Sequence, residues 1–111
     1  MEPRLHLRLY FGDIPFGPGK AALLHQIDAL GSIAAAGRAM GMSYKRAWDL
    51  VEEMNALFDQ PLVTTERGGA AKGGARVTER GRAVLTHYRA LMELVEGQGA
   101  RHIQALSAWL K

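Results

Sequence analysis

Residues 43–46 have side chains that could bind a polyanion, and they stand where a helix is expected to begin. They read Ser-Tyr-Lys-Arg and follow Gly41 and Met42. A serine hydroxyl in this place caps the first free backbone N–H groups of a helix. Basic side chains in a first turn oppose the helix dipole, a small cost that binding of phosphate would offset. The candidate DNA-binding residues of this segment are Ser43, Tyr44, Lys45 and Arg46.

A second basic stretch follows and is rich in glycine. Residues 61–82 contain five basic and two acidic residues, and residues 68–74 read Gly-Gly-Ala-Ala-Lys-Gly-Gly. Short segments rich in β-branched residues flank this run, which is typical of a hairpin tip. A phosphate-binding P-loop is excluded because no Lys-Ser/Thr pair follows the glycines. We expect a wing that lies along a DNA groove, with Arg67, Lys72 and Arg76 on phosphates.

The elements that position these residues follow from hydrophobic periodicity and from helix stop signals. Residues 4–11 alternate apolar and polar and predict a half-buried strand, followed by a loop. Three helices are then expected, the first ended by Gly31 and the second and third capped by Ser32 and Ser43. Two strands and a fourth helix capped by Thr78 come next, with a break at residues 97–99. The expected ranges are strand 4–11, helices 19–30, 33–40 and 44–58, strands 61–67 and 75–78, and helix 79–96.

Helical geometry sorts the side chains of the segment 44–58. The apolar face is predicted to hold Ala47, Leu50, Val51, Met54, Leu57 and Phe58. Lys45, Asp49 and Glu52 then lie on the opposite face. Tyr44 and Trp48 fall on one flank and Arg46 on the other. We expect Trp48 to pack structurally and Tyr44 to contact DNA.

The fourth helix has a broader apolar stripe than a core of three helices and a sheet needs. We therefore predict that this stripe forms a homodimer interface, which a two-fold symmetric assembly would bury. The residues expected there are Leu85, Tyr88, Leu91, Met92 and Val95. The whole reads as one domain over 1–111, mainly α with a small β-sheet. Its expected architecture is a winged helix-turn-helix with a wing at about 61–77 and dimerisation helices at about 78–111.

Several short motifs resemble the N-terminal domain of the molybdate-responsive ModE regulators, and more distantly the DNA-binding domain of LysR-type regulators. The similarity runs from about Leu5 to about Leu94. The motifs are Gly31-Ser-Ile, Gly41-Met-Ser-Tyr-Lys, Ala47-Trp-Asp, Glu53-Met-Asn55, Pro61-Leu-Val, Gly68-Gly, Lys72-Gly-Gly and Val77-Thr-Glu-Arg-Gly81. The resemblance implies a dimeric regulator that binds a palindromic operator in double-stranded DNA. It also implies that the separate β-rich domain in which family members bind molybdate is lacking from these 111 residues.

Composition narrows the remaining classes of function. The chain contains no cysteine, so disulfides, Cys-ligated zinc and thiol catalysis are excluded. The four histidines are scattered without metal-ligand spacing, and no catalytic constellation is visible. We therefore expect no enzyme activity, no cofactor and no metal. With no signal peptide and no membrane segment evident, a cytoplasmic location is expected.

One alternative stays open at this stage. The winged helix could serve as a protein-interaction adaptor that works with a separate sensor protein. Such a partner would bind the C-terminal helices through Leu91, Met92 and Trp109. The charges of the wing would then be dispensable.

Overall fold

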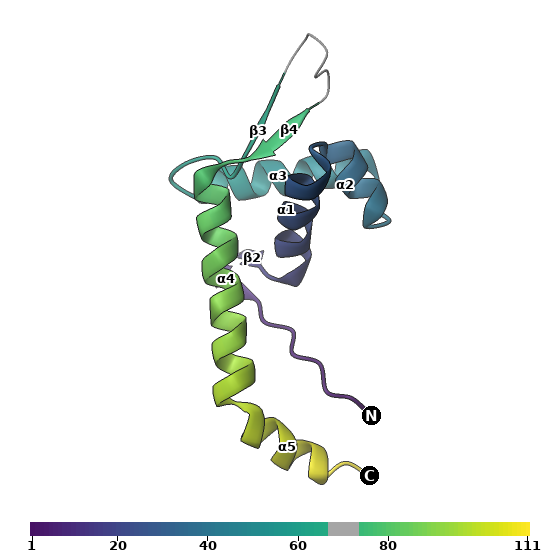
Figure 1. Ribbon diagram of the computed structural model, residues 1–111, viewed down its shortest axis with the longest axis vertical. Coiled ribbons are helices and arrows are strands. Elements are labelled where there is room, and N and C mark those ends of the chain that lie inside the picture. The colour runs from purple at the N-terminus through teal and green to yellow at the C-terminus, as the bar shows by residue number, and fades with distance from the viewer. Residues whose placement is uncertain (67–73) are drawn as a thin grey trace.

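The computed structural model describes residues 1–66 and 74–111, and the architecture is mainly α (Figure 1). The elements in chain order are β1 Leu9–Phe11, β2 Ile14–Phe16, α1 Pro18–Leu30, α2 Ile33–Ala39, α3 Tyr44–Leu57, β3 Val63–Thr65, β4 Ala75–Val77, α4 Glu79–Gln98 and α5 Ala100–Ala108. Helices α1, α2 and α3 cluster at one end, the strands β3 and β4 project beyond them, and α4 runs away in the opposite direction. The fold expected from the sequence, a winged helix-turn-helix with a long helix after the wing, is confirmed.

The first strand is much shorter than the alternating pattern predicted. Only Leu9–Phe11 form β1, which pairs antiparallel with β2 in the register Leu9 to Phe16 and Phe11 to Ile14. A strand needs a hydrogen-bonded partner, and Gly17 and Pro18 end β2 after three residues because Pro18 starts α1. The two hairpins are therefore separate two-stranded sheets, β1–β2 and β3–β4.

Aromatic contacts, rather than a sheet, fasten the first hairpin to the helices. Phe11 meets Phe58 edge to face at 6.0 Å between ring centroids. Phe16 contacts Phe58 at 6.2 Å and Tyr88 at 5.4 Å in the same way. The Tyr88 hydroxyl also donates to the backbone carbonyl of Leu7 at 2.8 Å. The segment before β1 is thus held to α4 without being a strand.

The helix boundaries follow the capping signals in the sequence. Gly31 ends α1 with φ 69°, a left-handed conformation that a side chain would strain. The hydroxyl of Ser32 accepts from the Ala35 N–H at 3.1 Å at the start of α2. The hydroxyl of Thr78 accepts from the Gly81 N–H at 3.0 Å at the start of α4. All three predicted signals are confirmed, and the helix ends lie within two residues of their expected places.

The core lies where α1 packs against α2, α3 and the wing base. Its largest fully buried side chains come from β2, α1, α3 and the segment that leads into β3. They are Phe16, Leu23, Leu24, Ile27, Val51, Met54 and Leu62. Because α1 contributes three of these seven and packs against α2, α3 and β4, it supports both the helix pair and the wing.

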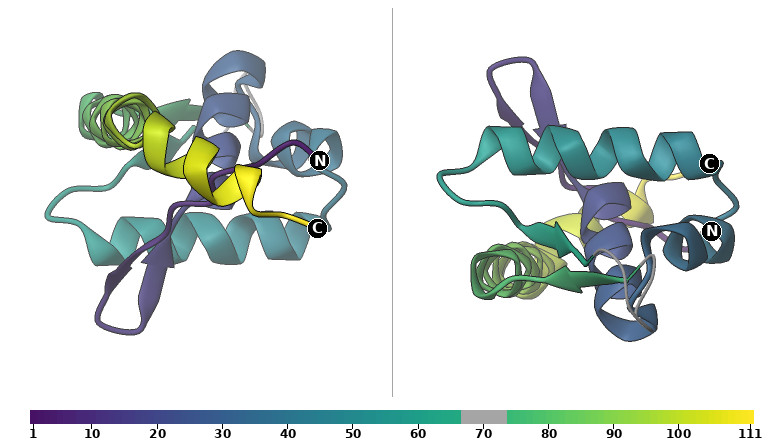
Figure 2. Two further views of the ribbon diagram at one scale, coloured as in Figure 1. Left: turned by 90° about the horizontal axis from the view of Figure 1, so that it is seen from below. Right: turned by 90° about the horizontal axis from the view of Figure 1, so that it is seen from above.

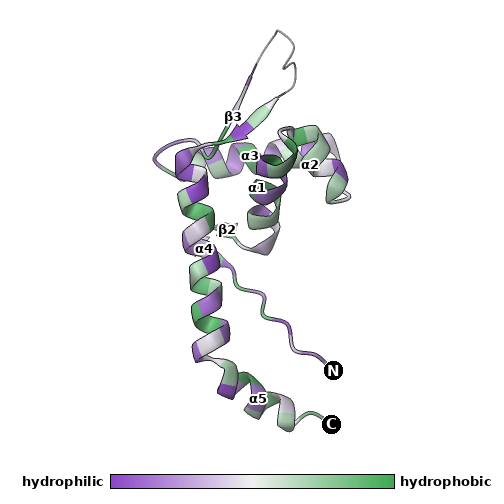
Figure 3. Ribbon diagram, in the orientation of Figure 1, coloured by the Kyte–Doolittle hydropathy of each residue, from purple (hydrophilic) through white to green (hydrophobic). Residues whose placement is uncertain are grey.

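The long helix breaks where the sequence predicted. α4 ends at Gln98, Gly99 caps it, and α5 continues at an angle (Figures 1 and 2). This arm lengthens the molecule to 58 × 28 × 24 Å. Apolar and polar residues alternate along α4 and α5 when the ribbon is coloured by hydropathy (Figure 3). Within the described residues, no helix combines the length and apolar character that crossing a membrane requires.

Candidate nucleic-acid interface

The start of α3 is built by a tight turn and a hydroxyl cap. Gly41 takes φ 71°, which turns the chain out of α2. Ser43 is extended, and its hydroxyl accepts from the Arg46 N–H at 3.1 Å. Gly37 of α2 lies so close to α3 that an added Cβ would sit 3.1 Å from the Cβ of Ala47. The first turn of α3 is therefore fixed in place with its side chains exposed.

The buried and exposed sides of α3 match the faces that its helical periodicity predicted. Ala47, Val51 and Met54 are fully enclosed, on the side of α3 that packs against α2 and α1. Leu50, Leu57 and Phe58 on the same side are only partly buried. On the side opposite the enclosed residues, Lys45, Asp49 and Glu52 are exposed. We call these last three residues the outer face of α3.

Tyr44 and Trp48 form a pair on one flank of this helix. Their rings meet edge to face at 6.0 Å between centroids. Tyr44 is 57% exposed, whereas Trp48 is half-buried and packs against the core. Trp48 thus supports the Tyr44 ring from behind, and Tyr44 remains available to a partner.

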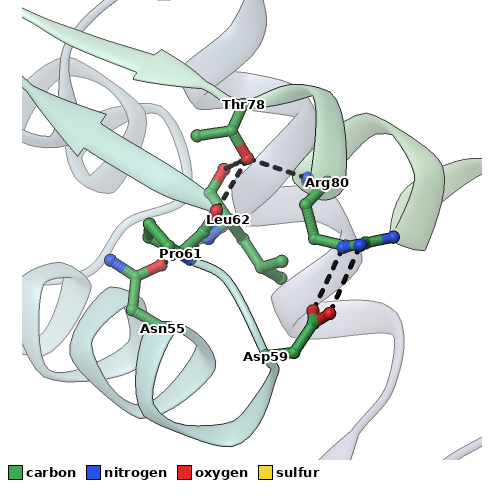
Figure 4. A network of polar contacts seen from close by, with 7 residues as sticks. Asn55, Asp59, Pro61, Leu62, Thr78 and Arg80 are labelled. Carbon is green, nitrogen blue, oxygen red and sulfur yellow. Dashed lines mark hydrogen bonds and ion pairs between the residues drawn. The ribbon is translucent and has the colours of Figure 1, made fainter.

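The wing lies on the same flank as Tyr44 and Trp48, because Asn55 shares that flank and binds the wing base (Figure 4). The Asn55 side-chain amide donates to the Val63 carbonyl at 2.9 Å. Its oxygen accepts from the backbone N–H of Leu62 at 2.8 Å and of Val63 at 3.1 Å. Sequence reasoning quoted Asn55 in a motif but missed this role, since its partners are backbone groups that no residue type reveals.

Further polar contacts close the junction between wing and α4 (Figure 4). The Thr78 hydroxyl donates to the Pro61 carbonyl at 2.7 Å while it caps α4. Arg80 pairs with Asp59, with 3.1 Å between Nε and Oδ1. These contacts tie both ends of the wing to the body of the domain.

Of the basic residues expected on DNA, the structure describes Lys45, Arg46 and Arg76, which lie in different surroundings. Lys45 pairs with Asp49 on the outer face, with 2.9 Å between Nζ and Oδ2. Hydrogen bonding to the Asp49 carboxylate, its charge and that of Glu52 raise the pKa of Lys45. Arg76 in β4 is exposed, with 3.8 Å between its Nη1 and Oε1 of Glu66. Arg67 and Lys72 lie outside the described residues.

Arg46 is on the flank of α3 that faces away from the wing. There it lines a hollow of about 540 Å³ together with Arg8, Leu50 and Glu53. The floor of the hollow contains Lys20, which is only 6% exposed and donates to the Pro15 carbonyl and to Glu53. This ion pair between buried Lys20 and exposed Glu53 was not predicted, since Lys20 sits in α1 at a position that a sequence alone marks as exposed.

The expected dimer residues divide into two groups. Leu85 and Tyr88 are only 6% and 7% exposed because they pack into the core of their own chain. Leu91, Met92 and Val95, further along α4, are half-buried and remain accessible.

Comparison with known proteins finds relatives whose names refer to molybdenum or to transcription regulation. No family model matches the chain. It is 47% identical to the molybdenum-pterin-binding protein MopA of Rhodobacter capsulatus over 72 residues, which are 65% of this chain and 27% of MopA. It is 44% identical to the molybdenum transport protein ModE of Azotobacter vinelandii over 69 residues, 62% of this chain and 26% of that protein. Identity to the DNA-binding transcriptional dual regulator ModE of Escherichia coli is 38% over 77 residues, 69% of this chain and 29% of ModE.

Solved structures share the fold at low sequence identity. A CbnR_DBD–DNA complex matches with a TM-score of 0.61 and 20% identity, covering 79% of this chain and 95% of that one. A LysR family transcriptional regulator matches with a TM-score of 0.57 and 17% identity, covering 78% of this chain and 28% of that one. The chain thus spans under a third of the length of the curated relatives named above. Over about two thirds of its own residues, it is a homologue of the N-terminal part of the ModE, MopA and MopB proteins, with a winged helix-turn-helix fold.

Proposed function

We propose that this chain is a sequence-specific DNA-binding transcriptional regulator that binds a palindromic operator as a homodimer. The observation that carries the proposal is the start of α3, which is capped by Ser43, exposes Tyr44 and Lys45, and is fastened to the wing through Asn55. Relatives that share this part of the sequence are named transcriptional regulators. A protein with the same fold was solved in complex with DNA.

In this proposal the first turn of α3 enters the major groove, as recognition helices of this class do. Ser43, Tyr44 and Lys45 contact base edges, and Arg46, on the flank away from the wing, reaches only the backbone. The wing, over about 61–77, contacts flanking phosphates through Arg67, Lys72 and Arg76. Residues 1–111 act as one domain, with 78–111 serving dimerisation.

Accessible apolar surface on α4 supports the homodimer. Leu91, Met92 and Val95 form the part of the stripe that the core does not enclose. Leu91 also borders an apolar hollow of about 410 Å³ between the first hairpin and α4, lined further by Phe11, Phe58 and Val84. A two-fold axis through this surface would set the two recognition helices about one helical turn of DNA apart, or a multiple of it.

Selection from genomic fragments tests the DNA-binding part directly. Purified protein is used to enrich fragments, and the enriched duplex is titrated against random duplex by fluorescence anisotropy at several salt concentrations. A palindrome bound at least about 10³-fold tighter than random DNA is expected. Weak, unselective binding that vanishes at physiological salt would contradict the proposal and favour a protein partner.

Sedimentation velocity tests the dimer separately. Val95→Glu places a charge on the accessible stripe and should shift the protein toward monomer. Leu30→Glu is the matched control, because Leu30 is an exposed leucine at the end of α1, outside residues 78–111. A dimer that survives Val95→Glu as well as it survives Leu30→Glu would exclude this surface as the interface.

A further inference from the structure

The outer face of α3 has a charge that simple attraction to DNA does not explain. It presents one basic residue, Lys45, and two acidic residues, Asp49 and Glu52, all exposed. A surface that only bound phosphates would be basic, since affinity for the DNA backbone comes from Lys and Arg. On the proposed recognition helix, the two carboxylates would instead weaken binding to any phosphate they approach. Their presence there needs a different reason.

Helix stability does not supply that reason. Lys45 and Asp49 form an i,i+4 pair with 2.9 Å between Nζ and Oδ2, and their side chains are 84% and 54% exposed. Exposed pairs of this kind contribute little to folding. The order is also the less favourable one, because the acidic residue is better placed before the basic one along a helix. The contact therefore fixes the Lys45 side chain more than it stabilises α3.

The pair with Asp49 keeps the Lys45 side chain along the outer face of α3. Without Asp49, the long lysine side chain would be free to swing to the nearest phosphate, which carries no sequence information. Bound to Asp49, it lies along the outer face, one turn into the helix. That face is the one a major groove would meet, because the opposite face is enclosed by α2 and α1. There, lysine pairs with the guanine O6 and N7 acceptors.

Carboxylates have a matching target in the major groove. The amino group of cytosine N4 donates to Asp or Glu, whereas guanine and thymine edges offer no donor there. A carboxylate on the outer face thus stabilises a complex in which a cytosine amino group faces it. It destabilises a complex in which only hydrogen-bond acceptors and phosphates face the carboxylate. Asp49 and Glu52 lie three residues apart, so they are neighbours on this face.

We propose that Asp49 and Glu52 are specificity-determining residues. Their carboxylates repel DNA that places no hydrogen-bond donor opposite them, and Asp49 also positions Lys45 for base contact. This inference rests on the proposed function of α3 as a recognition helix. It adds that discrimination comes partly from repulsion of wrong sequences, as specific interfaces commonly require.

The test compares variants on two duplexes. Asp49→Asn and Glu52→Gln each remove one negative charge and keep the side-chain shape. Asp13→Asn, at an exposed residue of the turn between β1 and β2, is the control with the same change in net charge. Each protein is titrated by anisotropy with the selected operator and with random duplex over a series of salt concentrations. Circular dichroism and Tm confirm that each variant is folded.

The expected result is a loss of selectivity. Both outer-face variants should bind random duplex more tightly, and the operator-to-random ratio should fall by about tenfold, the size of one good base contact. In Asp49→Asn the salt slope on random duplex should steepen by about one unit, because Lys45 gains a phosphate. Asp49→Glu, which can still hold Lys45, should keep most of the selectivity. Asp13→Asn should leave the ratio unchanged.

Two outcomes would overturn the inference, and they are distinguishable. A selective wild-type protein whose ratio is the same in Asp49→Asn, Glu52→Gln and Asp13→Asn would overturn this inference alone. A wild-type protein that shows no selectivity would overturn the proposed function and this inference with it.

Discussion

Asn55 in α3 and Val63 in β3 are joined by two hydrogen bonds, with the Asn55 amide donating to the Val63 carbonyl at 2.9 Å and its oxygen accepting from the Val63 N–H at 3.1 Å. One side chain thus continues the hydrogen bonding of the wing into the helix that precedes it. Helix α3 and the wing base are consequently fastened to each other. A binding surface that includes both α3 and the wing base is preorganised by this contact.

Replacing Asn55 by alanine should destabilise the domain. The change removes three hydrogen bonds and leaves backbone groups of Leu62 and Val63, both buried, without their partner. We expect a loss of about 2–3 kcal/mol and a Tm lower by roughly 10 °C. Asn55→Asp, which keeps the acceptor oxygen and loses the donor, should cost less. Thermal unfolding followed by circular dichroism measures both, and an unchanged Tm for the alanine variant would contradict the role of Asn55.

Two glycines of α4 should respond to alanine in opposite directions. At Gly81 an added Cβ would come within 2.4 Å of the Leu62 carbonyl oxygen and 2.7 Å of Val77 Cγ1. Gly81→Ala must therefore push the wing base away from α4, at a cost of about 2 kcal/mol or more. At Gly97 nothing lies within 4 Å, so Gly97→Ala should stabilise the helix by up to about 1 kcal/mol. Urea unfolding measures the free energy of unfolding of both variants. Equal changes in this free energy would contradict the close contact at Gly81 and show that helix propensity alone determines the effect.

Tyr88 should make stability fall at alkaline pH. Burial raises the pKa of its phenol above the ordinary value of 10.0, so the unfolded chain releases the proton at a lower pH than the folded one. The stability that depends on the neutral phenol is therefore complete below about pH 10 and decreases as the pH rises above it. Tyr88→Phe loses the hydrogen bond to Leu7, at a cost of about 1 kcal/mol near pH 7.

The difference between Tyr88→Phe and the parent protein should shrink as the pH approaches 11, because only the parent has this phenol to ionise. Urea unfolding at pH 7, 9 and 11 measures this difference in the free energy of unfolding. The other tyrosines and the lysines are common to both proteins, so their ionisation cancels in the difference. A constant difference across this range would show that Tyr88 does not control the alkaline loss.

Local signals in the sequence predicted the helices well. Gly31, Ser32, Ser43 and Thr78 act on groups within a few residues of themselves, so their roles are visible without a fold. The strand predicted at residues 4–11 was too long because alternation indicates which face is apolar and cannot show whether a neighbouring strand exists. β2 supplies only three residues of pairing.

The site was predictable only in part, for a related reason. The exposure of Tyr44 and Lys45 follows from helical periodicity, which a sequence contains. The contacts of Asn55 and Lys20 with distant backbone carbonyls depend on tertiary packing, as does the burial of Leu85 and Tyr88. An apolar stripe looks the same whether its own core or a second copy covers it.

The central claim is that the exposed start of α3 reads DNA sequence, and Tyr44→Ala tests it most directly. The Tyr44 ring is exposed and contacts only Trp48 among the aromatic residues that the structure describes, so its removal should leave the fold intact. Anisotropy titrations of both proteins with the selected operator and with random duplex give the selectivity of each. We expect the operator-to-random ratio to fall by about tenfold in Tyr44→Ala, with binding to random duplex nearly unchanged. Equal weakening on both duplexes, or no change on either, would contradict the assignment of α3 as the helix that reads sequence.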